Sequence, residues 1–112
     1  MSDDFLFAED EVESVSDEAI EPYHILIVDD DEEIHTITKM ALSEFRLDGR
    51  PLEFHSVHSG KEAIAFLNKN RDIAMMLLDV VMETDHAGLD VAKWVREELK
   101  NRLIRIVLRT GQ

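Results

Sequence analysis

The sequence has no cysteine, only two prolines and four glycines, and about half as many basic as acidic side chains. Without thiols there is no disulfide framework and no thiolate metal site, which fits a reducing, cytoplasmic compartment. Twelve Lys and Arg against twenty-five Asp and Glu give a formal charge of −13, which repels nucleic acid and anionic membranes and favours cations or basic partner surfaces. The N-terminus lacks a basic segment followed by a long apolar run, so neither a signal peptide nor a membrane anchor is expected.

The length of 112 residues predicts a single domain. Composition changes once, near Pro22. Residues 1–21 are rich in acidic side chains and serine, with one compact apolar group at 5–7, and they predict an acidic, disordered leader. The alternative for that segment is a docking motif or a short helix. Residues 22–112 form the predicted folded part.

Strand and helix patterns alternate along the folded part. Two continuous apolar runs, 23–29 and 73–79, each end in aspartate and are typical of strands buried on both faces of a parallel sheet. The remaining predicted strands cover 52–58 and 103–110, and the predicted helices cover 31–45, 59–70 and 89–101. The order βαβαβαβ predicts a parallel sheet with right-handed crossovers and helices on both faces.

Helical periodicity predicts which side chains face the core. The expected buried positions are Ile34, Ile37, Met40, Ala41 and Phe45 in the first helix, Ala63, Ile64 and Leu67 in the second, and Val91, Trp94 or Val95, and Leu99 in the third. Asp31 and Ser59 are predicted helix caps. We expect His35 to face solvent. His55 and His58 lie three apart on a strand, so we expect them on opposite faces and in no common metal site.

Three aspartates follow the ends of buried strands. In an open parallel sheet the ligand site lies beyond the carboxyl ends of the strands, so Asp29, Asp30 and Asp79 should converge at one edge. Thr110 ends the last strand in the same way. Carboxylates crowded together raise one another's pKa unless a cation lies among them. Because oxygen ligands suit a hard divalent ion, the cluster predicts a Mg²⁺ site.

The stretches "ILIVDDD", "MMLLDVVM" and "IVLRTG" resemble the acidic pair, the phosphoacceptor aspartate and the switch threonine of two-component response-regulator receiver domains. The resemblance covers the chain from about Tyr23 onward. It implies a flavodoxin-like, CheY-like doubly wound parallel sheet, incomplete after the fourth strand.

The resemblance also implies roles for single residues. Asp79 would accept a phosphoryl group from the phosphohistidine of a sensor histidine kinase or phosphotransfer protein, with Mg²⁺ offsetting its charge. Asp30 would bind the metal directly, Asp29 through water, and Val81 through its backbone carbonyl. Thr110 would turn its hydroxyl to the phosphoryl oxygen and so switch the surface that controls a downstream output.

The chain departs from the family at two places. The loop from Asp79 to Gly88 is one residue longer than usual, and its Glu83 either joins the metal shell or faces solvent, the latter being favoured. The family's fifth strand, and the lysine before it that contacts the phosphoryl group, have no counterpart, and no lysine present fits that role. We therefore expect a fragment of a longer regulator, or a homodimer or swapped dimer that covers the bare sheet face.

Three classes of function follow from these patterns. The first is a phosphorylated signalling domain that is not itself an enzyme, any effector enzyme lying beyond Gln112. The alternative is a receiver-like dimerisation or docking module that is not phosphorylated. A haloacid-dehalogenase-like phosphatase is disfavoured because Val81 stands where a second aspartate is needed. The ending and the acidic leader resemble receivers that precede cyclic-di-GMP-turnover domains.

Overall fold

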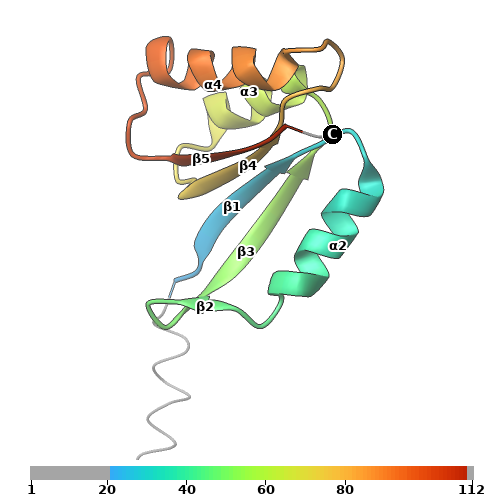
Figure 1. Ribbon diagram of the computed structural model, residues 1–112. Helices are drawn as coiled ribbons and strands as arrows, with labels where there is room; N and C mark the ends of the chain where they lie inside the picture. The colour runs from blue at the N-terminus through green and yellow to red at the C-terminus, as the bar shows by residue number, and fades with distance from the viewer. Residues whose placement is uncertain (1–20, 111–112) are drawn as a thin grey trace, which may run out of the picture.

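The computed structural model describes residues 21–110, which form a five-stranded sheet with helices on both faces (Figure 1). The strands are β1 (Tyr23–Val28), β2 (Arg46–Leu47), β3 (Arg50–Val57), β4 (Met75–Asp79) and β5 (Arg105–Arg109), and the helices are α2 (Glu32–Leu42), α3 (Gly60–Lys69) and α4 (Ala87–Glu97). Apart from Glu21, the predicted leader lies outside the described residues. No helix within this range combines the length and the apolar character needed to cross a bilayer.

The sheet has the order β2-β3-β1-β4-β5, and its four longer strands are all parallel. Helices α3 and α4 cover one face of the sheet and α2 lies against the other (Figure 1). This arrangement confirms the predicted parallel sheet with helices on both faces. Asp31 accepts a hydrogen bond from the amide of Glu33, and Ser59 accepts one from the amide of Glu62, so both predicted helix caps are present.

An antiparallel strand, β2, was missed by the sequence analysis, which interpreted this region only as a break between elements. β2 pairs with the start of β3 through a two-residue turn at Asp48 and Gly49, whose φ angles are 55° and 77°. Asp-Gly with both φ angles positive is the turn that best matches the right-handed twist of a hairpin. The Asp-Gly pair was therefore a sequence signal for a hairpin. Because β2 is antiparallel to β3, the sheet is mixed and not purely parallel.

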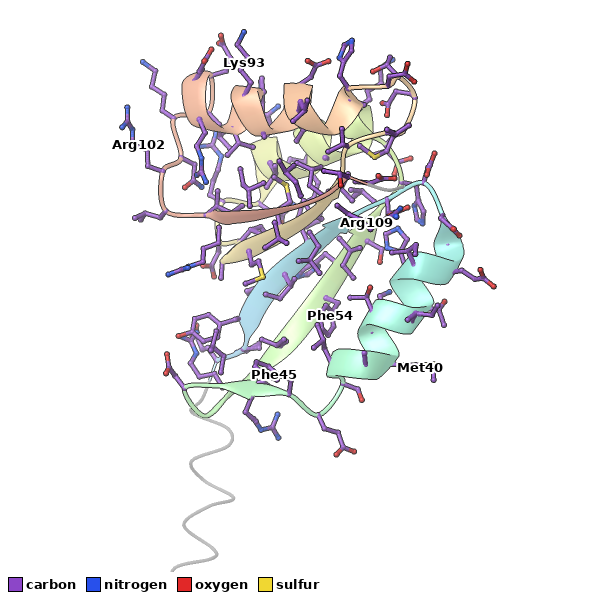
Figure 2. All side chains as sticks on the ribbon, viewed as in Figure 1. Met40, Phe45, Phe54, Lys93, Arg102 and Arg109 are labelled. Carbon is purple, nitrogen blue, oxygen red and sulfur yellow. The ribbon has the colours of Figure 1, made fainter. Side chains whose placement is uncertain are left out.

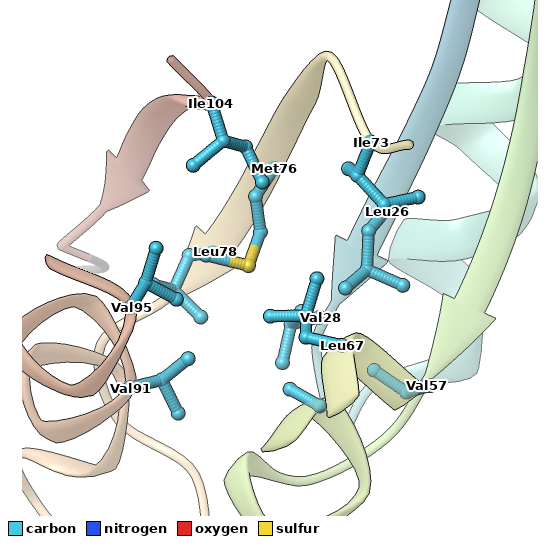
Figure 3. Close-up of a cluster of buried hydrophobic side chains, with 11 residues drawn as sticks. Leu26, Val28, Val57, Leu67, Ile73, Met76, Leu78, Val91, Val95 and Ile104 are labelled. Carbon is cyan, nitrogen blue, oxygen red and sulfur yellow. The ribbon is translucent and has the colours of Figure 1, made fainter. Parts of the chain in front are cut away.

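The main hydrophobic core fills the space between the sheet and the pair α3 and α4 (Figure 3). Alternation along β1 directs Leu26 and Val28 toward these helices, and Met76 and Leu78 of β4 extend the same layer. The helices contribute the fully buried side chains Ala63, Leu67, Val91 and Val95. Each fully buried aliphatic side chain contributes roughly 1.5–3 kcal/mol through removal of apolar surface from water. The predicted inner faces of α3 and α4 are thus largely confirmed, with Val95 rather than Trp94 at the centre.

The predicted inner face of the first helix is largely wrong, since Ile34 alone of its five residues is partly buried. Ile37, Met40 and Phe45 are 58%, 72% and 48% exposed, and Met40 points away from the sheet (Figure 2). The helix is instead rotated so that His35, which was expected in solvent, is fully buried. Its ring makes one hydrogen bond to the carbonyl of Asp29 and one to Ser56, and these two polar contacts set the rotation of α2.

Helix α4 begins two residues before the predicted start, because its first turn lies directly against the end of β4. The amide of Gly88 donates to the carbonyl of Val80 over 2.9 Å. A Cβ atom at Gly88 would lie 2.2 Å from the carbonyl oxygen of Asp79 and 2.6 Å from the Cα of Val80. Since both are backbone atoms, no side chain fits at this position without movement of the helix.

We predict that Gly88→Ala lowers the free energy of unfolding by about 1–3 kcal/mol, the usual cost of forcing extra atoms into a packed site. Chemical denaturation with urea measures the change. Gly60→Ala is the matched control, because its Cβ would first meet a side-chain atom, Val91 Cγ2, at 3.1 Å. Equal midpoints for the two variants would contradict the argument from backbone contact.

Candidate functional site

The parallel register brings three aspartates to one edge of the sheet. Val28 of β1 pairs with Leu78 of β4, so the next residues, Asp29 and Asp79, follow side by side at the carboxyl ends of these strands. Oxygen atoms of Asp29, Asp30 and Asp79 all lie within 4.8 Å of one another. Asp29 and Asp79 are buried at 2% and 5% exposure, whereas Asp30 is exposed. We call these three residues the acidic pocket. Two of its carboxylates are buried, and the third faces solvent.

Burial makes the charge of Asp79 costly. Desolvation raises the pKa of Asp79, and the neighbouring carboxylate of Asp29 raises it further. The amide of Val81 donates to Asp79 Oδ1 over 3.3 Å and partly offsets this effect. Asp29 Oδ1 accepts a hydrogen bond from the amide of Asp31 over 2.9 Å. Backbone donors therefore reach both buried carboxylates but leave negative charge that attracts a cation.

A guanidinium group lies between the two buried carboxylates. Arg109 is the residue of β5 that pairs in register with Asp79. Its Nη2 is 3.0 Å from Asp29 Oδ2 and 3.4 Å from Asp79 Oδ2, and its Nε also donates to Asp29 Oδ2 over 3.3 Å. The hydrogen bond with Asp29 raises the pKa of Arg109 above its ordinary value. Arg109 is thus an internal counter-ion of the acidic pocket.

Sequence reasoning missed Arg109 because it searched only for a lysine. The signal was present in the spacing, since Arg109 precedes Thr110 and takes the same register position on its strand as Asp79 does on β4. Residues in register on adjacent parallel strands point to the same face of a sheet. An arginine in this position therefore points toward the carboxylates.

His35 fixes the backbone of the acidic turn. Its Nε2 lies 2.8 Å from the carbonyl oxygen of Asp29 and its Nδ1 lies 2.9 Å from Ser56 Oγ. Because a carbonyl only accepts, Nε2 carries a proton, and in the neutral ring Nδ1 then accepts from the Ser56 hydroxyl. The ring of His58 lies 4.5 Å from that of His35, and His58 also bonds Glu32. His35 therefore ties α2 and β3 to the turn that carries Asp29 and Asp30.

Glu83 is exposed, as the favoured expectation from the sequence had it, and its carboxylate also bonds to helix α3. Its Oε1 accepts a hydrogen bond from the backbone amide of Gly60 over 3.0 Å, and its Oε2 accepts one from the backbone amide of Lys61 over 3.2 Å. These amides belong to the first turn of α3, where free N–H groups favour negative charge. The bond from Gly60 is the main reason that the pKa of Glu83 is lowered. The long loop after Asp79 is therefore fastened to α3.

The two remaining predicted site residues lie at the same edge. The backbone of Val81 lies beside the carboxylate of Asp79, because its amide donates the hydrogen bond described above. Thr110 is exposed and follows the last residue of β5. The amide of Val80 donates to the carbonyl of Arg109 over 3.1 Å, which joins the loop after Asp79 to the end of β5.

The donor set of the acidic pocket fits a hard divalent cation. Its side-chain ligands are carboxylate oxygens only, two of them buried and one open to solvent. Mg²⁺ binds through one or a few carboxylates while it retains several waters, so an open side suits it. Burial and the neighbouring carboxylate of Asp29 raise the pKa of Asp79, so a cation bound beside it would stabilise its charged form.

No protein-family model matches the chain. A curated relative that is 56% identical over 92 residues is the 3'3'-cGAMP-specific phosphodiesterase 2 of Vibrio cholerae serotype O1. The match covers 82% of this chain and 18% of that protein. The chain therefore spans less than a fifth of the length of the curated relative that it matches.

Three solved structures share the fold. A sulfate-bound alanine mutant of the response regulator MaeR has a TM-score of 0.65 at 22% identity. The match covers 82% of this chain and 70% of that one. The bacteriophytochrome response regulator AtBRR has a TM-score of 0.63 at 27% identity, with coverage of 79% of this chain and 66% of that one. A response regulator receiver protein from Pseudomonas putida has a TM-score of 0.57 at 23% identity, with coverage of 79% and 69%. These likenesses establish the flavodoxin-like fold, with four parallel strands in the described residues.

We predict that Glu83→Gln lowers the free energy of unfolding at pH 7 by about 0.5–1 kcal/mol, the lower part of the range for helix caps because the side chain is exposed. The lowered pKa of Glu83 means that its charge stabilises the fold at neutral pH. This contribution is lost as the pH falls through the folded-state pKa, so the two proteins should converge at acid pH, below that pKa. Urea denaturation across this pH range measures the difference. Asp85→Asn, a charge loss in the same loop, is the control and should show no such dependence.

We predict that Arg109→Gln has opposite effects on the metal-free fold and on metal binding. Loss of the counter-ion lowers the metal-free stability by about 1–2 kcal/mol, less than for a fully buried pair because Arg109 is 48% exposed. Mg²⁺ affinity rises by roughly tenfold, since about 1.4 kcal/mol of competing ion-pair energy is removed. Urea denaturation and calorimetric titration with Mg²⁺ measure the two effects. Arg105→Gln removes the same charge from the other end of β5, and an equal gain in affinity there would show that only net charge matters.

Proposed function

We propose that the chain is a receiver domain of a two-component response regulator and that Asp79 is its phosphoacceptor. The observation that carries the proposal is the acidic pocket itself: a buried carboxylate with a raised pKa, at a strand end, beside two more carboxylates. A lone acidic turn that only capped a helix would not need Asp79. The matching fold of known response regulators supports this assignment.

The proposed reaction is transfer of a phosphoryl group from the phosphohistidine of a sensor histidine kinase or phosphotransfer protein. A carboxylate oxygen of Asp79 attacks phosphorus, the bond to the histidine nitrogen breaks with its electron pair staying on that nitrogen, and an acyl phosphate forms. The domain thereby modifies itself and is not an enzyme acting on a separate substrate. Val81 positions the acceptor through its amide, which holds one carboxylate oxygen.

The metal site of the proposal uses four protein groups. Asp30 and Asp79 would bind Mg²⁺ directly, Asp29 through water, and Val81 through its carbonyl oxygen. Bound there, the ion supplies positive charge that offsets the repulsion between Asp79 and the incoming phosphoryl group. Asp30 is the exposed member of the acidic pocket, so it is accessible from solvent.

Arg109 and Thr110 complete the proposed switch. Arg109 leaves its place between Asp29 and Asp79 because a second cation at the same carboxylates is repelled. Thr110, the next residue, then donates its hydroxyl to a phosphoryl oxygen. Since the carbonyl of Arg109 is bonded to the amide of Val80, this movement alters both the end of β5 and the loop after Asp79. Such a local charge event is the usual origin of a switched surface.

We further propose that the domain regulates an effector enzyme in a longer protein. The support is the 56% identical relative, whose name assigns it phosphodiesterase activity toward 3'3'-cGAMP. A cyclic-dinucleotide phosphodiesterase is accordingly the proposed output, in a cytoplasmic protein. Self-association through the edge strand β5, as a homodimer or swapped dimer, is the proposed mode of assembly, because its Val107 and Leu108, which point to opposite faces of the sheet, are 50% and 41% exposed.

A docking module that is not phosphorylated is the second candidate. The specific observation in its favour is that Arg109 already neutralises part of the acidic pocket. If the guanidinium remains there when Mg²⁺ is added, the domain has a permanently fixed surface instead of a switched one.

We predict that the chain forms an acid-stable, base-labile phosphoryl adduct with acetyl phosphate and Mg²⁺, and that Asp79→Asn abolishes it. Intact-mass spectrometry detects the adduct, and Mg²⁺-dependent binding of beryllofluoride provides a second measurement. Asp85→Asn, in the exposed loop, is the matched control and should retain both. Absence of the adduct and of beryllofluoride binding in the unmodified chain would overturn the phosphoacceptor proposal and favour the docking module.

A further inference from the structure

A second group of ligand-type side chains lies on the face of the sheet that α3 covers. It consists of His24 from β1 with Glu53 and His55 from β3, here called the histidine cluster. In the register of these strands His24 pairs with Glu53, and Leu26 pairs with His55. Alternation along the two strands therefore places all three side chains on the same face. Sequence reasoning missed this cluster because it compared His55 only with His58.

The donor atoms of the histidine cluster already converge. His24 Nδ1 and His55 Nε2 are 3.0 Å apart, and one donor atom from each of the three residues lies within 4.8 Å of the others. In tetrahedral zinc sites the metal to nitrogen distance of about 2.0–2.1 Å places two ligand nitrogens about 3.3 Å apart. The observed separation is within a few tenths of an ångström of this value, and the two rings have to turn so that both nitrogens point at an ion beside the line that joins them.

The surroundings hold the two rings in place. Both histidines are partly buried, and the His55 ring packs against the Phe66 ring with centroids 5.4 Å apart. Their backbones belong to adjacent, hydrogen-bonded strands, which position ligands more firmly than loops do. The His24 and His55 rings are tilted by 32°, so they are not stacked face to face. The strands therefore hold two nitrogen ligands close together, and only the ring orientations have to change.

We propose that His24, His55 and Glu53 bind one Zn²⁺ ion, with water as the fourth ligand. Two imidazoles and one carboxylate are a donor set that zinc uses, whereas Mg²⁺ prefers oxygen ligands alone. The ring that carries the hydrogen between His24 and His55 changes tautomer, so that this proton moves through solvent to its other nitrogen and both rings bind in the neutral form. The exposed carboxylate of Glu53 supplies one negative charge to the site.

There is room for the ion and its water. His24 and His55 line a cavity of about 280 Å³ together with Phe66, Lys69, Asn70, Arg71, Asp72 and Ile73. Lys69 and Arg71 are exposed, so their charged ends can turn to solvent while their stems stay at the rim. The carboxylates of Asp72 and Glu53 offset the positive charges of Lys69 and Arg71.

The zinc proposal does not depend on the proposed phosphoacceptor function. His24 precedes Asp29 by five residues along an extended strand, a distance of about 16 Å. The ion would join β1 to β3 near the end of the sheet opposite the acidic pocket. Binding there stabilises the folded chain, because the two strands bring the ligands together only when paired.

The test is calorimetric titration of the untagged chain with Zn²⁺ in excess Mg²⁺, which saturates the acidic pocket. We expect one Zn²⁺ per chain and a higher unfolding temperature with zinc. His24→Gln, His55→Gln and Glu53→Gln should each weaken binding by at least about tenfold. Glu53 is exposed, so its variant keeps the fold even if a histidine variant does not. His86→Gln, at an exposed histidine bonded to Asp90, is the matched control and should bind zinc as the unmodified chain does.

Nitrogen-resolved NMR of the imidazoles gives an independent measurement. Zinc should shift His24 Nδ1 and His55 Nε2, the two nitrogens that face each other. Unchanged resonances at these nitrogens, or equal zinc affinity in the Glu53→Gln and His86→Gln variants, would overturn the proposal and leave a hydrogen-bonded histidine pair.

Discussion

The repulsion between the buried carboxylates of Asp29 and Asp79 is the constraint on which the site depends. The parallel register fixes these residues side by side, so the chain cannot relieve the repulsion by separating them without breaking the pairing of β1 with β4. It compensates with amides from Asp31 and Val81 and with the guanidinium of Arg109. A sheet edge assembled for stability alone would not place two aspartates there, since paired apolar residues of similar size cost less to bury.

The backbone around Asp79 connects this charge to distant elements. Val80 donates to the carbonyl of Arg109 and accepts from Gly88, so one residue joins β5 to the start of α4. Glu83, three residues further on, binds the first turn of α3. A movement of Arg109 therefore acts on an edge strand and on the two helices that cover the main core. The long loop transmits this change because both of its ends are bonded and its conformation is not free.

The sequence predicted the parallel sheet, the edge at which the aspartates meet, and the inner faces of α3 and α4, because apolar periodicity and strand order determine these features. It failed for α2, where Ile37 and Met40 follow the helical period yet are exposed, since two hydrogen bonds of His35 determine the rotation instead. Arg109, the bonds of Glu83 to α3 and the histidine cluster were missed for a related reason. Each acts through a partner distant in the sequence, and only the strand register or the loop path reveals that partner.

The counter-ion Arg109 also bears on how the protein is made. A nascent chain must bury Asp29 and Asp79 before any ion has been acquired, and an acidic pocket without its own cation would favour open, protease-sensitive states during that interval. Arg109, on the last described strand, supplies part of the compensating charge as soon as β5 has joined the sheet. The fold can therefore form before a divalent cation binds, and the ion then adds the remaining positive charge to a site that is already assembled.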